Sequence, residues 1–294
     1  MARDKTTAQM KRQNIDQTQV SATEIAEVIE DIVQQKDPFD ERVICYAQPI
    51  YDAHTHTFRQ AEVLMRLLVG DVVVKPAQFI PLAEKNKSIF DLTYILINKV
   101  CRSMSGSLSK YDFDRITINF SPDMFCNGEM AKNTQKIIAA NGAYVKKFCI
   151  ELTEQTFADE KGEQSEVKDR MNHMKQAGIK LYLDDFGIGY SSIARITTYP
   201  FSVIKIDKRI LDIAVINECM GELIGMMITV LKKHGYEILM EGVENEQGKQ
   251  FALDKKVDYI QGFLYAKPVP FEELVNYFQP IGQQEKKREE KDER

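Results

Sequence analysis

The sequence predicts an α/β fold: a (β/α)8 TIM-like barrel with one antiparallel strand, preceded by an N-terminal helical extension. Three observations support this prediction. Eight short β-rich segments recur along the chain, helical patterns lie between most of them, and the first two are joined by a turn too short for a helix. The 294 residues, 44% of them hydrophobic, suffice to bury a barrel-sized core. An open doubly wound sheet is the structural alternative.

Residues 1–40 are expected to form a polar N-terminal segment followed by an amphipathic helix. Its apolar residues recur at helical spacing: Val20, Ile25, Val28, Ile29, Ile32 and Val33. Ser21 or Thr23 is suited to cap this helix, and Asp37-Pro38 ends it. Two interpretations stay open: a helix packed on the main domain, or a linker or dimerisation helix of a longer signalling protein.

The main domain is expected over residues 41–281, followed by a charged, solvated tail over 282–294. Its β-rich segments lie at 43–49, 61–68, 116–119, 147–151, 179–184, 203–206, 237–240 and 257–261. Pro76 opens one of the intervening helices, Gly178 and Gly235 follow two others, and a last helix is expected over 271–278. The short turn over 51–60 implies a hairpin, so one strand should run antiparallel to the rest.

Composition excludes several classes of protein. A net charge of −5 gives no general attraction to nucleic acid or to an anionic membrane. The polar N-terminus lacks the apolar core of a secretory signal, and no apolar run is long enough to span a bilayer, so a cytoplasmic protein without a membrane segment is expected. Five scattered cysteines without a C-x-x-C pair argue against a disulfide framework or a zinc site.

Polar side chains gather at the carboxyl ends of the predicted strands. They are Asn119, Glu151, Asp184, Asp185, Lys205, Glu241 and Gln261, with Glu62 inside the second strand. These ends meet at one rim of a barrel, where the carboxylates would repel one another unless protons or cations relieve them. Because the candidate ligands are carboxylates and an amide, Mg²⁺ or Mn²⁺ is favoured over Zn²⁺.

Strand geometry refines this site. Asp184 and Asp185 are adjacent, so they can share it only if the strand ends between them, and the glycines of the following Phe-Gly-Ile-Gly permit such a break. Lys205 and Asp207 are two residues apart and share a face, which aims a lysine at the acidic rim. A lysine there can hold and polarise a water or stabilise charge on a phosphate.

In order and spacing, eight segments over roughly residues 41–280 resemble the EAL-domain phosphodiesterases. They are E-V-L-M-R at 62–66, K-P-A-Q-F-I-P-L-A-E at 75–84, I-N-F-S at 118–121, E-L-T-E at 151–154, L-D-D-F-G-I-G-Y-S-S at 183–192, I-K-I-D at 204–207, E-G-V-E at 241–244 and Q-G-F at 261–263. Val63 replaces the alanine of the family's namesake triplet, and Ile188 stands where a smaller residue or threonine is usual.

The resemblance implies a metal-dependent hydrolysis of cyclic di-GMP to linear pGpG with two divalent ions, Mg²⁺ or Mn²⁺. By the family pattern one ion would be held by Glu62, Asn119, Glu151 and Asp184, and the second by Asp184, Asp185 and Glu241, directly or through water. Lys205 would orient or deprotonate the attacking water. The substrate would meet Gln48, Arg66, Gln261, Asp207 and Glu244, while Glu154 would position the Asp184–Asp185 loop.

From the same resemblance we expect that this chain can form a homodimer, and that a signalling or diguanylate cyclase domain can lie upstream of it. Two other functions stay open. One is a non-catalytic cyclic di-GMP receptor that signals through a partner, although every metal-ligand position is occupied by a suitable residue type. The other is a different barrel metallohydrolase acting on another phosphodiester, which the carboxylate set alone permits.

Overall fold

The computed structural model describes residues 20–121, 124–125, 128–140, 145–153, 164–187 and 193–281. The predicted charged tail over 282–294 and the first 19 residues lie outside the described residues. The chain divides into two compact units, one made of Met1–Ile44 and Met65–Leu96, the other of Cys45–Leu64 and Ile97–Arg294. Among the described helices, none combines the length and the apolar character that a membrane crossing requires.

The first unit is built around the predicted N-terminal helix, which is present as α2 (Ala22–Gln35). Ser21 caps it: its hydroxyl accepts a bond from the Glu24 amide, and the Glu24 carboxylate accepts one from the Ser21 amide. Ile25, Ile29 and Ile32 bury one face of α2, which packs against α3 (Pro76–Lys85). Pro76 is the first residue of α3, a position where proline's missing amide hydrogen costs no hydrogen bond.

The second unit contains most of the barrel. The strands are β1 (Val43–Asp52), β2 (Thr57–Val69), β3 (Val72–Val74), β4 (Tyr111–Asp112), β5 (Arg115–Phe120), β6 (Phe148–Thr153), β7 (Lys180–Phe186), β8 (Val203–Ile206), β9 (Glu237–Met240), β10 (Tyr259–Ile260), β11 (Val269–Pro270) and β12 (Gln279–Pro280). The order β1-β10-β9-β8-β7-β6-β5-β2 closes on itself through a β1–β2 pairing. Strand β1 is antiparallel to β10, whereas β2 is parallel to β5, so the predicted antiparallel strand is confirmed and is the first one.

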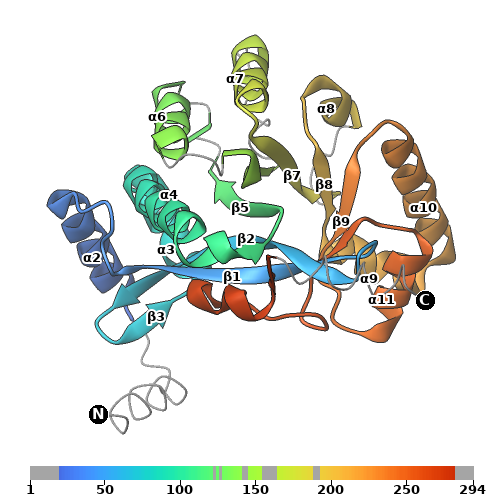
Figure 1. The fold of residues 1–294 in the computed structure, drawn as a ribbon, viewed down its shortest axis with the longest axis horizontal. Helices are drawn as coiled ribbons and strands as arrows, with labels where there is room; N and C mark the ends of the chain where they lie inside the picture. The colour runs from blue at the N-terminus through green and yellow to red at the C-terminus, as the bar shows by residue number, and fades with distance from the viewer. Residues whose placement is uncertain are drawn as a thin grey trace, which may run out of the picture. The chain divides into compact units, whose positions relative to one another are not determined.

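Helices line the outer side of β5 to β9 (Figure 1). The remaining helices are α4 (Ile89–Ser105), α6 (Gly128–Ala140), α7 (Gln164–Gln176), α8 (Ile193–Thr198), α9 (Lys208–Ile216), α10 (Glu218–Lys233) and α11 (Glu246–Asp254), with 3-10 turns at Ser107–Lys110, Val145–Lys147 and Phe271–Asn276. The predicted last helix over 271–278 is therefore a shorter 3-10 helix. Gly178 and Gly235 follow α7 and α10 with φ of 92° and 87°, as expected for helix-ending glycines.

The interior of the barrel is arranged in layers, because side chains along a strand alternate between its two faces. A buried cluster fills the middle layer: Ile50, Cys149, Tyr182, Val203, Leu239 and Tyr259. Each member lies two residues from a predicted site residue on the same strand or at its end, respectively Gln48, Glu151, Asp184, Lys205, Glu241 and Gln261. The apolar layer thus supports the polar one and fixes where its side chains point.

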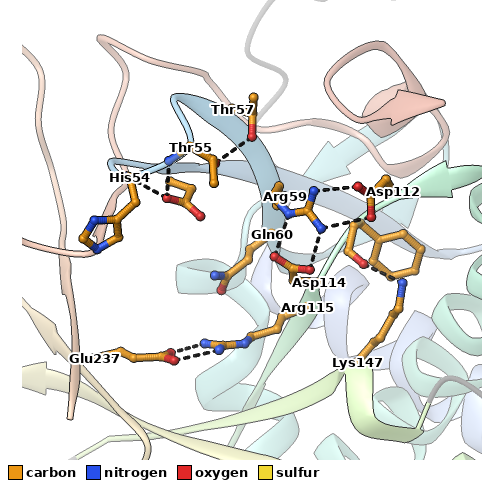
Figure 2. Close-up of polar contacts among 12 residues, drawn as sticks. His54, Thr55, Thr57, Arg59, Gln60, Asp112, Asp114, Arg115, Lys147 and Glu237 are labelled. Carbon is orange, nitrogen blue, oxygen red and sulfur yellow. Dashed lines mark hydrogen bonds and ion pairs between the residues drawn. The ribbon is translucent and has the colours of Figure 1, made fainter. Parts of the chain in front are cut away.

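Charged and polar side chains also occupy the opposite, amino-terminal side of the parallel strands (Figure 2). Arg115 at the start of β5 forms an ion pair with Glu237 at the start of β9 and donates to the Tyr182 hydroxyl at 3.2 Å. That hydroxyl in turn donates to Gln60 Oε1 at 2.8 Å. Because these partners come from four strands, they tie the barrel together beneath the apolar layer.

Candidate active site

The centre of the candidate site is Lys205 on β8, whose side chain is 1% exposed. Its Nζ lies 2.5 Å from Glu151 Oε2, 2.8 Å from Glu241 Oε1, 3.0 Å from Asp184 Oδ1 and 3.7 Å from Glu62 Oε2. These four carboxylates come from β6, the end of β9, β7 and β2. The structure thus brings together five of the residues that the sequence placed at one rim.

Glu62 is held in one orientation by two amides. Asn119 Nδ2 donates to Glu62 Oε1 at 2.6 Å, and Gln261 Nε2 donates to Glu62 Oε2 at 2.7 Å. Gln261 Nε2 also lies 3.1 Å from Gln48 Oε1, and Gln48 Nε2 donates to the carbonyl of Ala266 at 3.0 Å. This chain of bonds connects the antiparallel strand β1 to the carboxylate ring.

Burial and crowding shift the ionisation of this ring. Burial raises the pKa of Glu151 to about 8 and the pKa of Glu241 well above its usual value; Lys205 opposes both shifts, and neighbouring carboxylates add to them. Burial alone would lower the pKa of Lys205, but the surrounding carboxylates outweigh it and hold that pKa well above its usual value. A single ammonium group thus faces four carboxyl groups, and two of these, Glu151 and Glu241, have raised pKa values.

The Asp184–Asp185 pair is built differently from the prediction. Strand β7 does not end between them but continues to Phe186, and its register with β8 shifts between Leu183 and Phe186. Asp185 has a φ of 57°, in the left-handed region, and its amide donates to Asp184 Oδ1 at 2.9 Å. This irregularity, rather than the end of the strand, lets two consecutive aspartates break the alternation.

Burial and then Asp184 and Asp207 raise the pKa of Asp185, whose side chain is 48% exposed. Its Oδ1 lies 3.8 Å from Arg209 Nη2. Asp184 lies 3.0 Å from Lys205, whereas Asp185 interacts with Lys205 only through longer-range electrostatics, so Asp185 stands at the edge of the carboxylate ring.

A cavity of about 240 Å³ opens beside the ring. It is lined by Gln48, Glu62, Asp207, Lys208, Glu241, Gly242, Glu244, Gln261, Gly262 and Phe263. Asp207 also caps α9, accepting bonds from the amide and Nε of Arg209 at 2.7 and 2.9 Å, while Glu244 lies 3.1 Å from Lys208 Nζ. The predicted substrate residues Gln48, Gln261, Asp207 and Glu244 therefore share one cavity with Glu62 and Glu241.

Two predicted residues are not assembled here. Arg66 belongs to the first unit, where its guanidinium donates to the Met65 carbonyl at 2.9 Å. Its role as a fork to a phosphate stays a prediction. Glu154 lies outside the described residues, so the prediction that it positions the Asp184–Asp185 loop is also untested.

Sequence reasoning missed four residues of the cavity: Lys208, Gly242, Gly262 and Phe263. Each of the two glycines directly follows a predicted site residue at the end of a strand, and this position could have indicated both of them from the sequence. A Cβ on Gly262 would lie 2.1 Å from the Val243 carbonyl oxygen, and one on Gly242, whose φ is 64°, would lie 2.3 Å from Lys208 Cβ. The close approach of the Val243 backbone therefore requires Gly262, and the positive φ and the Lys208 side chain require Gly242.

The ring has the chemistry of a hard-cation site. Its donors are carboxylate oxygens with the exposed amide of Asn119 beside them, and Glu151 Oε1 is buried without a hydrogen-bond partner. Within the described residues no three acidic, histidine or cysteine side chains are already grouped as metal ligands. The Lys205 ammonium contacts the carboxylates instead. The donor set and the unpaired oxygen fit Mg²⁺ or Mn²⁺.

Comparison with known families agrees with this arrangement of motifs. The model of the EAL domain matches residues 29–268. The chain belongs to the EAL domain family. The match covers the barrel strands β1 to β10 and every site residue named above.

Two known proteins are similar to this chain at low identity. The cyclic di-GMP phosphodiesterase PdeL of Escherichia coli (strain K12) is 29% identical over 233 residues, which are 79% of this chain and 64% of PdeL. The signaling protein YkoW of Bacillus subtilis (strain 168) is 26% identical over 240 residues, 81% of this chain and 30% of YkoW. The chain thus spans less than two thirds of the length of these relatives.

Solved structures support the barrel fold. A PaMucR phosphodiesterase in complex with c-di-GMP superposes with a TM-score of 0.75 at 22% identity, covering 85% of this chain and 99% of that one. An EAL domain protein from Listeria monocytogenes EGD-e gives the same TM-score and identity, covering 88% and 98%. At this identity the likeness establishes the fold, and the site must be argued from its own residues.

Proposed function

We propose that this EAL domain is a metal-dependent phosphodiesterase that hydrolyses cyclic di-GMP to linear pGpG at the carboxyl rim of its barrel. The observation that carries the proposal is the ring of four carboxylates around the buried Lys205. A purely structural ring would be costly, because each buried carboxylate loses its hydration and repels its neighbours. Relatives named as cyclic di-GMP phosphodiesterases support the choice of substrate.

Each part of the rim has a role in this proposal. Glu62, Asn119, Glu151 and Asp184 would hold one divalent cation, and Asp184, Asp185 and Glu241 would serve the second, directly or through water. Such cations, when bound, lower the pKa of a coordinated water and neutralise charge on phosphate oxygens. Lys205, whose ammonium form the surrounding carboxylates stabilise, orients the attacking water. Gln48, Gln261, Asp207 and Glu244 line the cavity that would receive the substrate.

A hydrolysis assay tests the proposal. The protein is incubated with cyclic di-GMP in Mg²⁺, Mn²⁺ or EDTA, and products are separated by chromatography. The expected result is pGpG in the presence of either cation and none in EDTA. Glu62→Gln, which keeps the size of the side chain, should abolish product formation, whereas Glu246→Gln on the exposed surface of α11 should not.

Intact cyclic di-GMP under every condition would overturn the proposed function. A binding titration would then separate the alternatives. Saturable binding without turnover would establish the receptor function instead. If cyclic di-GMP neither binds nor reacts, a panel of other phosphodiesters, including bis(p-nitrophenyl) phosphate, would test for a different metallohydrolase.

A further inference from the structure

A second cavity, of about 390 Å³, lies at the other end of the barrel strands. Its lining comes from three places: α7, the segment Thr197–Phe201 before β8, and the turn His234–Tyr236 before β9. In full, the lining residues are Lys168, Asn172, Lys175, Thr197, Thr198, Tyr199, Pro200, Phe201, His234, Gly235 and Tyr236. Because β8 and β9 start here and end at the carboxylate ring, this cavity is separate from the candidate active site. We call it the basic cavity.

One wall of the basic cavity is a single face of α7. Lys168, Asn172 and Lys175 are spaced four and three residues apart, so they lie above one another on the helix. The neighbouring face carries the buried Val167, Met171 and Met174, which pack into the core. Core packing therefore fixes the direction in which α7 presents its two lysines.

The other walls are preformed. The Tyr236 hydroxyl donates to the carbonyl of Ile196 at 2.8 Å, which ties the turn before β9 to α8. Tyr199 and Phe201 are buried and contact edge to face, with ring centroids 6.3 Å apart. The cavity therefore does not depend on flexible surface side chains alone, and its volume lies in the range typical of small-molecule sites.

The charged side chains that line the cavity, within the described residues, are both lysines. Among the residues that the structure describes, no aspartate or glutamate lines it, whereas Lys168, Lys175 and His234 do. Three carboxylates are close by in sequence. Asp169 does not line the cavity, Glu166 is paired with Arg170, and Glu237 is paired with Arg115 and Lys180. Within the described part of the chain, no ion pair is recorded for the side chains of Lys168, Lys175 or His234.

Helix ends explain only part of this charge. Lys175 lies in the last turn of α7 and His234 caps the end of α10, where a positive charge is favoured by the helix dipole. Lys168 lies in the first half of α7, away from its carboxyl end, so the dipole gives no reason for a cation there. A negatively charged ligand that contacts both Lys168 and Lys175 would account for the position of Lys168.

We propose that the basic cavity binds a small molecule that carries a phosphate group, with the phosphate held between Lys168 and Lys175 and within reach of Asn172 and His234. Phosphate suits this lining because ammonium groups act as point charges toward it, and an amide and an imidazole add directional donors. The proposal is independent of the proposed hydrolase activity, since none of these residues contributes to the carboxylate ring.

Isothermal titration of the full chain with inorganic phosphate and with guanosine monophosphate tests the proposal, in EDTA and at constant ionic strength. Inorganic phosphate tests for binding of the free anion, and guanosine monophosphate tests for binding of a phosphate ester. Uncharged guanosine serves as the ligand control. The double substitution Lys168→Met/Lys175→Met should weaken binding of the phosphate-bearing probe by at least about tenfold, the loss expected for one charge-assisted contact or more. Lys132→Met/Lys136→Met is the matched control, because it removes two exposed lysines from α6, outside the cavity, and should leave the affinity unchanged.

Hydrolysis of cyclic di-GMP and the thermal unfolding midpoint should be unchanged in the cavity variant, which shows that it is folded. If the double variant fails to fold, the single variants Lys168→Gln and His234→Gln replace it, each expected to weaken binding. Equal losses in the cavity and control variants would reduce the effect to nonspecific attraction and overturn the proposal. Absence of saturable binding for both phosphate-bearing probes, or equal binding of guanosine, would also overturn it.

Discussion

At the scale of single residues, Lys205 decides the character of the site. It is the only cation within 4 Å of the four carboxylates, in the part of the chain that the structure describes, and it is fully buried. Its ammonium group therefore balances charge in the folded protein, and in the proposed function it would also orient the attacking water. These two roles can be separated experimentally, because one affects stability and the other affects turnover.

Replacing Lys205 by methionine keeps a long apolar stem but removes the charge. We expect hydrolysis to fall by about 10²–10³-fold, the usual loss when one donor that stabilises developing charge is removed. We also expect the free energy of unfolding in EDTA to fall by about 3–5 kcal/mol, because buried carboxylates lose their partner. Lys249→Met, on exposed α11, is the matched control for both measurements. Near wild-type turnover of the Lys205 variant would contradict its assigned role.

At the scale of secondary structure, each predicted strand overlaps an observed one, although the one predicted over 257–261 is only two residues long, Tyr259–Ile260. The segments over 203–206 and 237–240 match β8 and β9 as observed. Lys205 and Glu241 could therefore be placed at the rim from the sequence, since strand direction and alternation determine their positions. Short pairings such as β3 and β11 escaped prediction because two or three residues carry no periodic pattern.

Details of the site that depend on tertiary contacts could not be predicted. The left-handed conformation of Asp185 and the register shift in β7 arise from pairing with β8, which no local pattern reveals. The bond from Gln48 to the Ala266 carbonyl joins residues 218 positions apart. Lys208 was missed because a lysine that begins a helix resembles an ordinary solvated residue until the fold places it over Gly242.

Asp258 offers a test of how the elements are held together. It accepts bonds from Lys232 of α10, His54 of the β1–β2 hairpin and the amide of Ile238 in β9, each at 2.8 Å. Burial alone would raise the pKa of Asp258, but these bonds outweigh it and lower that pKa below 3.8. Because the pKa is lowered in the folded state, the stabilisation is present above about pH 3.8 and is lost as the pH falls through the folded pKa.

Asp258→Asn should therefore lower the free energy of unfolding by about 1–3 kcal/mol at neutral pH. The difference from wild type should shrink as the pH falls below 3.8, the usual value for an aspartate. Urea unfolding at several pH values measures this, with Asp254→Asn on exposed α11 as the control. A difference that stays constant down to low pH would show that charge is not the cause.

At the scale of the whole molecule, the barrel separates two polar ends by one apolar layer. One end concentrates negative charge around Lys205, and the other carries the Arg115–Glu237 pair and, on its outer side, the basic cavity. The expected division of the chain at residues 40 and 281 stays a prediction, as do the homodimer and an upstream signalling domain. The excess of carboxylates at one end should make the stability of the entire fold depend on divalent cations, which can be measured without any substrate.

Divalent cations should stabilise the folded chain, because the ring exists only in the folded state and its carboxylates repel one another without a cation. Adding Mn²⁺ or Mg²⁺ to EDTA-treated protein should raise the thermal unfolding midpoint, by the equivalent of about 2.7 kcal/mol at a hundredfold excess over the dissociation constant. Glu151→Gln should reduce this rise, since Glu151 Oε1 is a buried carboxylate oxygen without a hydrogen-bond partner, whereas Glu246→Gln should preserve it. Identical unfolding midpoints of the wild-type protein in EDTA and in millimolar Mn²⁺ would show that the ring does not hold a cation, and Lys205 would then be its sole counter-ion.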